Sequence, residues 1–332
     1  MENPTTTMAA FIDTLTFTLP ADSSVTSYSV DDDFTTELTI AALDAFLRPA
    51  GLQVGTYCGG GKNFYRRAYW LEYSRDNEVI PELPALSALG FVAVGGNSDT
   101  ACVYLTGFAC SFLNMSSLMP TLRKQLESYN ARITRCDTAL DCLNGEYTVD
   151  DAVEWWNTDR FTTKGGKPTK YTCHGGWLPG QESERTFEVG SRQSTKFTRI
   201  YEKGAQLGDP DSPWVRFEIE WKSSNGAVIP YEILDNPGAY LRDAYDCFSW
   251  IPADREPADA VKYAKRSELK IDVDHFKKHC RTQYGKLIST LLGLGIPADH
   301  LLADLSRSGI PARLIVPPVL TLDERRDTPL PF

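Results

Sequence analysis

Two segments near the middle of the chain alternate between apolar and polar residues, and this pattern constrains the fold more than any other feature of the sequence. The segments are Phe197-Thr-Arg-Ile-Tyr-Glu-Lys-Gly204 and Trp214-Val-Arg-Phe-Glu-Ile-Glu-Trp221. Successive side chains of a β-strand point to opposite faces of the sheet, so a period of two predicts a strand with two unlike faces. The chain must therefore build a sheet that has a polar face and an apolar face in this region.

The polar faces of these two segments combine groups of three chemical kinds. The first segment carries Arg199, Tyr201 and Lys203 on one face, and the second carries Arg216, Glu218 and Glu220. A face with a phenol, several cations and two carboxylates is poorly suited to a dry core. It suits phosphodiester chemistry, which needs a nucleophile, phosphate clamps and metal ligands close together.

The charge of the chain is unevenly distributed. The 332 residues carry a net charge of −10, which argues against a protein that coats nucleic acid indiscriminately. Residues 160–203, however, include nine Lys and Arg residues but only four Glu residues. This run is interpreted either as a defined site for a polyanion or as a solvated loop with a charged fringe, and the sequence leaves both open.

The order of the expected elements predicts an α+β fold with a mostly antiparallel sheet and flanking helices. We expect strands at residues 11–19, 64–73, 90–94, 101–107, 131–141, 186–190, 197–203 and 215–222. We expect helices through residues 38–47, 115–129, 148–156, 230–234, 238–244 and 273–294. Thr148-Val-Asp-Asp151 resembles a capping box with Asp in place of Glu.

The domain organisation follows from changes in composition along the chain. We expect a disordered lead over residues 1–8, one α+β domain over 9–254, a helical extension over 255–309 and a Pro-rich tail over 310–332. The eight cysteines lack metal-site spacing, and most lie in apolar runs, which indicates reduced thiols in a reducing compartment. No secretion signal and no membrane span is expected, so we predict a cytoplasmic protein without a membrane partner.

Several carboxylates are candidate metal ligands. Asp137 and Asp141 would share a strand face but lie about 13 Å apart, too far to chelate one ion easily. Asp137 could instead meet Glu218 or Glu220 from a neighbouring strand. Surface ion pairs are the alternative interpretation of these acids.

Three further features are candidates on weaker grounds. Tyr201 is flanked by two cations, which would favour the phenolate and make it a better nucleophile; the alternative is an amphipathic tyrosine at the rim of the sheet. His174, in a basic loop, could ligate a metal or could simply be exposed. Gly59-Gly-Gly-Lys62 suggests a phosphate loop but lacks the P-loop spacing, and Asn63 stands where Ser or Thr would follow.

Several motifs occur in the order found in one known family. Val189 to Gly208, Trp214 to Trp221, the strand Arg135-Cys-Asp-Thr-Ala-Leu-Asp141 and Gly145-Glu-Tyr-Thr-Val-Asp-Asp-Ala152 carry the likeness. Over residues 90–250 the chain resembles the replication initiation factors of filamentous phages and of rolling-circle plasmids, the Rep_trans type. Arg135-x-Asp137-x-Ala139-x-Asp141 is similar to the R-x-D-x-A-x-D segment of that family.

The resemblance implies an enzyme that nicks one DNA strand at a replication origin through a tyrosine. The protein would become linked to the 5′ phosphate, assisted by Mg²⁺ or Mn²⁺, and the free 3′ hydroxyl would prime synthesis by a host polymerase. The partner would be origin DNA, single-stranded or locally melted, in the cytoplasm of a bacterial host. A host helicase and a second copy of the chain are further possible partners under this resemblance. Residues 255–332 would either contact the helicase or pack on the sheet.

The resemblance also assigns roles to individual residues. It implies metal or acid roles for Asp137, Glu218 and Glu220. His174, from the basic loop, is a further candidate metal ligand, and Glu188 is a candidate catalytic residue beside Tyr201. The resemblance implies phosphate contacts for Arg192, Arg199, Lys203 and Arg216. We also expect Arg135 and Lys196 to contact DNA.

One position departs from the family pattern. Relatives often carry a tyrosine in a T-x-Y-x-G-S strand, whereas this chain has Thr186-Phe-Glu-Val-Gly-Ser191, with Glu188 at that place. Either Tyr201 is the nucleophile, or the chain has lost nicking and is a DNA-binding regulator. A metal-dependent nuclease that uses water is a third possibility.

Overall fold

The computed structural model describes residues 8–20, 33–74, 89–96, 100–162, 169–178, 180, 183–224, 227–253 and 273–306. The chain forms two compact units, Met1–Ala264 and Lys265–Phe332. The expected lead and tail lie wholly or mostly outside the described residues, as does the expected boundary at residue 255. These parts of the domain organisation stay predictions.

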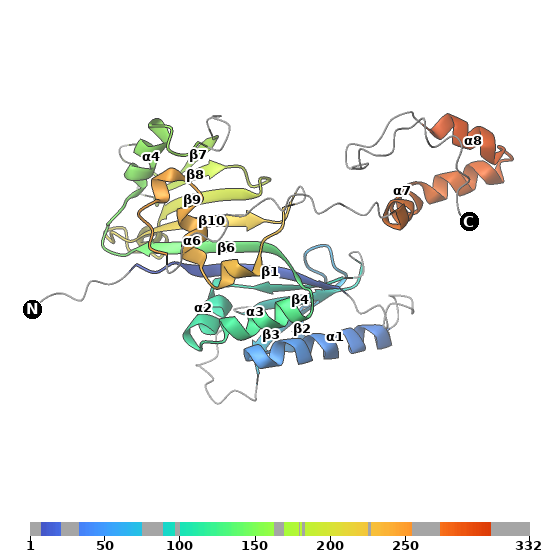
Figure 1. Cartoon of the computed structure of the whole chain (residues 1–332), viewed down its shortest axis with the longest axis horizontal. Helices are drawn as coiled ribbons and strands as arrows, with labels where there is room; N and C mark the ends of the chain where they lie inside the picture. The colour runs from blue at the N-terminus through green and yellow to red at the C-terminus, as the bar shows by residue number, and fades with distance from the viewer. Residues whose placement is uncertain are drawn as a thin grey trace, which may run out of the picture. The chain divides into compact units, whose positions relative to one another are not determined.

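The first unit is built on one ten-stranded sheet in which every neighbouring pair of strands is antiparallel. The strand order is β2-β3-β4-β5-β1-β6-β10-β9-β8-β7 (Figure 1). The strands are β1 (Phe11–Pro20), β2 (Leu52–Tyr57), β3 (Arg67–Tyr73), β4 (Gly90–Val94), β5 (Thr100–Leu105), β6 (Arg132–Cys142), β7 (Tyr171–His174), β8 (Thr186–Gly190), β9 (Lys196–Glu202) and β10 (Val215–Lys222). This confirms the predicted α+β fold.

Helices connect and cover these strands. The first unit contains α1 (Asp33–Leu47), α2 (Gly107–Met115), α3 (Met119–Ser128), α4 (Val149–Asn157), α5 (Lys203–Gln206) and α6 (Pro237–Arg242), with the short 3₁₀ helices η1 (Arg48–Ala50), η2 (Tyr231–Leu234) and η3 (Asp246–Phe248). The second unit contains α7 (Val273–Gly293) and α8 (Ala298–Leu305), which confirms that the C-terminal extension is helical. None of the helices in the described residues has the length and apolar character of a membrane span.

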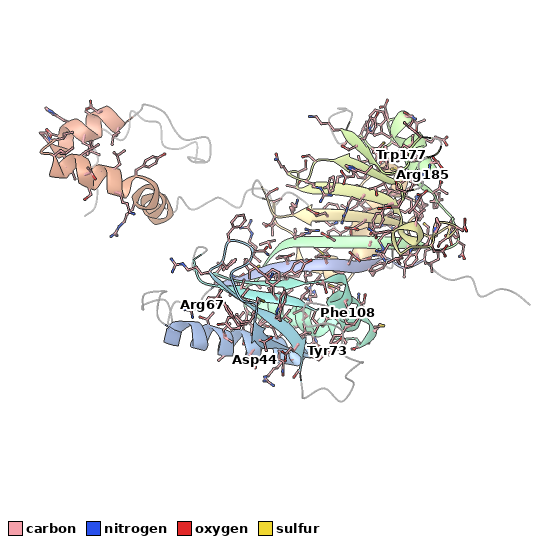
Figure 2. The ribbon with its side chains drawn as sticks, turned by 180° about the vertical axis from the view of Figure 1, so that it is seen from behind. Asp44, Arg67, Tyr73, Phe108, Trp177 and Arg185 are labelled. Atoms are coloured by element: carbon pink, nitrogen blue, oxygen red, sulfur yellow. The ribbon has the colours of Figure 1, made fainter. Side chains whose placement is uncertain are left out.

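The main hydrophobic core lies on one face of the sheet. Helices α2, α3 and α6 lie in front of the strands in Figure 1, and the view from behind shows most of the strands of this unit uncovered by helices (Figure 2). Of the described helices, the short α5 lies beside this other face, where Gln206 lines a pocket with Tyr201. Phe17, Phe217 and Ile219 point into this core, where they meet helix residues such as Phe46 and Trp155. The apolar side chains of each alternating strand therefore pack against the helices, and the polar side chains lie on the opposite face of the sheet.

The predicted helix over residues 115–129 is present as α3, but it begins four residues later than expected, at Met119, because Met115 ends a separate helix, α2, that was not predicted. Thr106 caps α2 by accepting a hydrogen bond from the Ala109 amide at 3.3 Å. Ser117 has a left-handed φ of 56°, which breaks the helical path, and Pro120 then suits the first turn of α3.

Other boundaries also differ from the predictions. Strands β2 and β7 were not expected, and β3 begins at Arg67 because Asn63 and Phe64 have left-handed φ angles of 50° and 69°. The capping box is confirmed: the Thr148 hydroxyl accepts from the Asp151 amide, and the Asp151 carboxylate accepts from the Thr148 amide at 2.7 Å.

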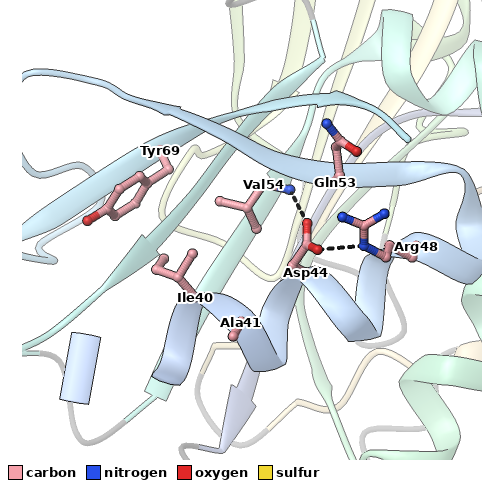
Figure 3. A pocket seen from close by; sticks show the side chains of 7 residues that line it. All are labelled: Ile40, Ala41, Asp44, Arg48, Gln53, Val54 and Tyr69. Atoms are coloured by element: carbon pink, nitrogen blue, oxygen red, sulfur yellow. Dashed lines mark hydrogen bonds and ion pairs between the residues drawn. The ribbon is translucent and has the colours of Figure 1, made fainter. Parts of the chain in front are cut away.

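One edge of the sheet is protected by a side chain from α1. Strand β2 is the edge, and an unpaired edge amide is a template for unwanted pairing. The Asp44 carboxylate accepts from the Val54 amide at 2.9 Å and from Arg48 Nε at 2.6 Å (Figure 3). The hollow beside this contact, about 500 Å³, is lined on its sheet side by Gln53 and Tyr69.

The contribution of core packing to stability can be tested at Phe217. Phe217 is fully buried and its ring contacts the rings of Trp155, Phe248 and Trp250. We expect Phe217→Ala to lower the free energy of unfolding by about 3–5 kcal/mol, because a large cavity replaces the ring. Urea unfolding measures this. Met115→Ala, at a position 80% exposed, is the control and should change it by less than about 0.5 kcal/mol; a loss of similar size in both variants would contradict the packing described.

Candidate active site

The predicted polar strand faces come together on the face of the sheet opposite the helices. In the strand register, Glu188 of β8 lies opposite Arg199 of β9, and Arg199 lies opposite Glu218 of β10. The charged face, as we define it, consists of Arg135, Asp137, Asp141, Glu188, Arg199, Tyr201, Arg216, Glu218 and Glu220. Residues from four neighbouring strands thus form one continuous surface.

Glu218 occupies the centre of the charged face. Its side chain is 1% exposed, and one carboxylate oxygen accepts a hydrogen bond from Arg199 Nη2. The other oxygen accepts from the Tyr201 hydroxyl at 3.1 Å. A buried carboxylate requires such partners, because an unpaired charge removed from water is strongly unfavourable. Glu218 therefore fixes the positions of the phenol and the guanidinium group on either side of it.

Asp137 and Glu220 form a second group, next to the first. They lie opposite each other on β6 and β10. Arg135 donates to Asp137 Oδ1 at 2.9 Å and lies 3.0 Å from Glu220 Oε2, and Lys222 pairs with the other Glu220 oxygen. Burial raises the pKa of Asp137 to about 7, because desolvation outweighs the attraction of Arg135, and Glu218 and Glu220 raise it further.

Arg216 is held by two carboxylates. It donates to Asp141 at 2.7 and 2.9 Å and to Asp13 at 2.8 Å. The register of β1 shifts between Ile12 and Thr14, and this bulge places Asp13 where its carboxylate reaches Arg216. Asp13 was not among the predicted site residues. Its sequence context offers one hint, an Asp in a strand that otherwise alternates between apolar residues and Thr. The β-bulge that directs its side chain toward Arg216 cannot be recognised from the sequence.

Tyr201 is less accessible and less acidic than the two cations that flank it in the sequence led us to expect. It lies on the charged face, not in the apolar core, but it is only 7% exposed. Burial raises the pKa of its phenol well above the usual value, and the Glu218 carboxylate raises it further, against the smaller opposing effect of Arg216. The expectation that nearby cations favour the phenolate is therefore wrong for this arrangement. The phenol needs a base to remove its proton, and Glu218 is in hydrogen-bond contact with it.

A pocket of about 250 Å³ opens beside Tyr201. It is lined by His174, Thr186, Glu188, Arg192, Arg199, Tyr201 and Gln206. Glu188 takes part in two contacts there, at 3.1 Å from His174 Nε2 and 3.1 Å from Arg192 Nη2. The position where relatives often carry a tyrosine therefore lines the same pocket as Tyr201.

The structure does not bring all the predicted cations to this face. The Lys196 ammonium lies on the helix side of the sheet, where it donates to the Ala244 carbonyl at 2.6 Å and sits 3.6 Å from the Tyr245 ring centroid. Burial there lowers the pKa of Lys196 to about 8. Lys203 is not on a strand, because β9 ends at Glu202 and Lys203 begins α5. Its ammonium still lies 5.7 Å from the centroid of the Tyr201 ring.

The carboxylates of the charged face do not fit a divalent ion in this arrangement. Among the described residues, no group of three His, Cys, Asp or Glu side chains is placed to hold a metal. Both oxygens of Asp137, Glu218 and Glu220 already accept from a cation or from Tyr201. His174 pairs with Glu188 and does not join them. The metal roles proposed for these four residues stay predictions that this geometry does not favour.

The burial of Asp137 predicts a specific pH dependence of stability. Its pKa rises from 3.8 to about 7 on folding, so between these values the folded state binds a proton that the unfolded state does not. Its contribution to stability is thus complete below about pH 4 and is lost as the pH rises to 7. From pH 5 to pH 8 we expect Asp137 to reduce the free energy of unfolding by about 2 kcal/mol.

Asp137→Asn isolates this effect, because the amide cannot ionise. Urea unfolding of both proteins at pH 5 and pH 8 should show a smaller stability loss with pH in the variant. Equal losses in the two proteins would show that Asp137 ionises normally in the folded state.

Comparison with known proteins finds a family model that covers this site. Residues 131–295 match the family model described as replication initiation factor, a range that contains every residue of the charged face. A solved structure of a rolling circle replication initiator protein from Geobacillus stearothermophilus shares 18% identity over 75% of this chain and 93% of its own, with a TM-score of 0.48. No curated protein matches the chain. Residues 131–295 are thus similar to the replication initiation factor family, as the motifs of the sequence predicted.

Proposed function

We propose that this protein nicks one strand of DNA at a replication origin, with Tyr201 as the nucleophile, to start rolling-circle replication. The observation that carries the proposal is the hydrogen bond from the Tyr201 hydroxyl to Glu218 at 3.1 Å, on a face lined with guanidinium groups. A nucleophile in contact with a base that is itself oriented by a third group is the usual arrangement for covalent catalysis. Arg199 is that third group, because it holds the other oxygen of Glu218.

The chemical step uses these residues in fixed roles. Glu218 accepts the phenolic proton as the Tyr201 oxygen attacks the phosphorus of a backbone phosphodiester. The bond from phosphorus to the 3′ oxygen breaks, and this oxygen takes up a proton from water, which leaves a 5′ phosphotyrosine and a 3′ hydroxyl. That hydroxyl is the group a polymerase extends. The raised pKa of Tyr201 makes the base necessary, since the phenolate is scarcely populated near neutral pH.

The neighbouring cations stabilise the charge that develops on the phosphate. Arg199 lies beside Glu218 in the pocket that Tyr201 also lines. Arg216 lies opposite Tyr201 in the strand register, fixed by two carboxylates, so little reorganisation would be needed when charge develops nearby. Arg192, with 62% of its side chain exposed, is the most accessible cation of the pocket.

Metal dependence and protein partners stay separate predictions. The resemblance implies Mg²⁺ or Mn²⁺. Origin DNA, single-stranded or locally melted, is the proposed partner, and the pocket beside Tyr201 is its proposed place of attack. A host helicase, a host polymerase and a second copy of the chain are expected partners with no described contact.

A DNA-binding regulator without nicking activity is the second candidate. Glu188, in place of the tyrosine that relatives often carry, favours it, as does the 7% exposure of Tyr201. Such a protein would bind DNA in a salt-sensitive way and leave the strand intact. A nuclease that uses water is the third candidate, and it would cleave without remaining on the DNA.

We expect Tyr201→Phe to abolish covalent attachment and to leave DNA binding within about threefold. The protein is incubated with Mg²⁺ or Mn²⁺, or with a chelator, and a supercoiled plasmid that carries its own gene and flanking DNA. Protein-linked DNA is then sought on a denaturing gel. Glu218→Gln should slow the reaction by about 10²- to 10⁴-fold, because the general base is lost.

The matched control is Tyr171→Phe, a half-exposed tyrosine on β7 that stacks on Phe187. It should form the adduct like the unaltered protein. Adduct formation by Tyr201→Phe would exclude Tyr201 as the nucleophile. Binding without any cleavage would favour the regulator, and cleavage without an adduct would favour the nuclease.

We expect two cations that lie near each other in the sequence, Arg192 and Lys196, to differ in their effect on the salt dependence of DNA binding. Arg192→Ala should lower the slope of log affinity against log salt by about 1, the value expected for one lost phosphate contact. Lys196→Met should leave the slope unchanged, because the Lys196 ammonium lies on the helix side of the sheet. Fluorescence anisotropy with a labelled single-stranded oligonucleotide measures both slopes. A change in slope for Lys196→Met alone would contradict the assignment of the charged face as the DNA surface.

A further inference from the structure

A row of aromatic side chains continues the charged face across the other half of the sheet. In the strand register, Trp70 lies opposite Phe91, Phe91 opposite Tyr104, Tyr104 opposite Thr16, and Thr16 opposite Arg135. Residues directly opposite each other in antiparallel strands share a face, so this row lies on the same face as Arg135. Neighbouring strands are ~4.8 Å apart, so Trp70 lies about 19 Å from Arg135.

These rings form a packed surface rather than isolated contacts. Phe91 and Tyr104 are stacked, with ring centroids 5.1 Å apart and planes inclined by 30°. The Lys62 ammonium lies 4.7 Å from the Trp70 ring centroid and 5.4 Å from that of Phe91. A positive charge is therefore held directly above the aromatic row.

Lys62 belongs to the loop of residues 58–66 between β2 and β3, which is anchored to this face at several points. Asn63 contacts the Cys102 sulfur at 3.9 Å, and the Tyr65 hydroxyl is hydrogen-bonded to Thr100 at 2.6 Å. A side chain at Gly61 would meet the Tyr65 carbonyl oxygen at 1.9 Å, so only glycine allows this close turn. The Gly59-Gly-Gly-Lys62 motif of the sequence therefore belongs to a loop that is held against the sheet.

Phe64 stands at the tip of the anchored loop and is directed away from the protein. It is 97% exposed, although both neighbours in the chain, Asn63 and Tyr65, are held against the aromatic face. Its φ of 69° follows a φ of 50° at Asn63, a left-handed pair that side chains of this size seldom adopt. A hydrophobic ring fixed in water by its own loop is unfavourable unless another surface covers it.

We infer that the 58–66 loop and the adjoining aromatic row bind the unpaired bases of single-stranded DNA, with Phe64 stacking on a base and Lys62 contacting the backbone phosphate. This inference rests on the proposed function, because it assigns a path for the strand that reaches Tyr201. Aromatic rings interleaved with cations form the usual surface for single strands, since every base has a face that stacks.

The charges around the loop favour this occupant over an apolar protein surface. Lys62 lies above the row, Arg66 is exposed in the same loop, and Arg135 marks the end of the row that joins the charged face. A partner that combines flat apolar rings with regularly spaced negative charge matches this arrangement. Single-stranded nucleic acid has both properties.

The test measures binding separately from nicking. A twelve-nucleotide thymidine oligonucleotide with one 2-aminopurine in place of a base reports both affinity and stacking by fluorescence. Phe64→Ala should weaken binding by about 5- to 100-fold and reduce the quenching of 2-aminopurine, because one base loses its stacking partner. Phe64→Trp should retain both, and Phe64→Leu should behave like Phe64→Ala.

Two controls separate stacking from charge and from folding. Met115→Ala removes another highly exposed apolar side chain and should bind like the unaltered protein. An abasic oligonucleotide of the same length should bind equally to the unaltered protein and Phe64→Ala, because it offers phosphates without bases. Unchanged affinity of Phe64→Ala for the thymidine oligonucleotide would overturn the inference, as would an equal loss for the abasic one.

The outcome is distinguishable from failure of the proposed function. If no variant forms a covalent adduct but binding still depends on Phe64, the nicking proposal fails and this inference stands. If the adduct forms through Tyr201 while Phe64→Ala binds normally, the nicking proposal stands and this inference fails.

Discussion

The arrangement of the site depends on one buried carboxylate, Glu218, whose two oxygens accept from Arg199 and from the Tyr201 hydroxyl. Leaving it unpaired on this face would be strongly unfavourable, so its partners are fixed in place. The flanking residues Phe217 and Ile219 pack into the core on the other side of the sheet. The same strand thus anchors the helices with one set of side chains and orders the reactive groups with the other.

Much of the fold was predictable from local patterns. Period-two alternation located β8, β9 and β10, and Thr148 with Asp151 marked the start of α4. The short strands β2 and β7 were missed because neither segment has a distinct alternation of its own, and each is ordered by the longer strand beside it. The break between α2 and α3 was missed because it depends on the backbone conformation of Ser117, which no propensity reveals.

The members of the site were more predictable than their contacts. Alternation correctly placed Tyr201, Glu218 and Glu220 on one face, since strand periodicity alone decides this. It could not give the register that sets Arg199 beside Glu218, nor the bulge that brings Asp13 to Arg216. It also overestimated the acidity of Tyr201, because burial is a property of the whole fold. The basic run contained Lys196, whose charge lies on the helix side of the sheet, so proximity in sequence did not mean a shared surface.

The central claim is that the phenol held by Glu218 is the group that becomes bonded to DNA. Mass spectrometry of the covalent complex tests it most directly, after trypsin has digested the protein and nuclease has trimmed the DNA. The account predicts a nucleotide attached to the peptide Ile200-Tyr-Glu-Lys203, which contains no tyrosine other than Tyr201. A nucleotide attached to any other tyrosine would contradict it.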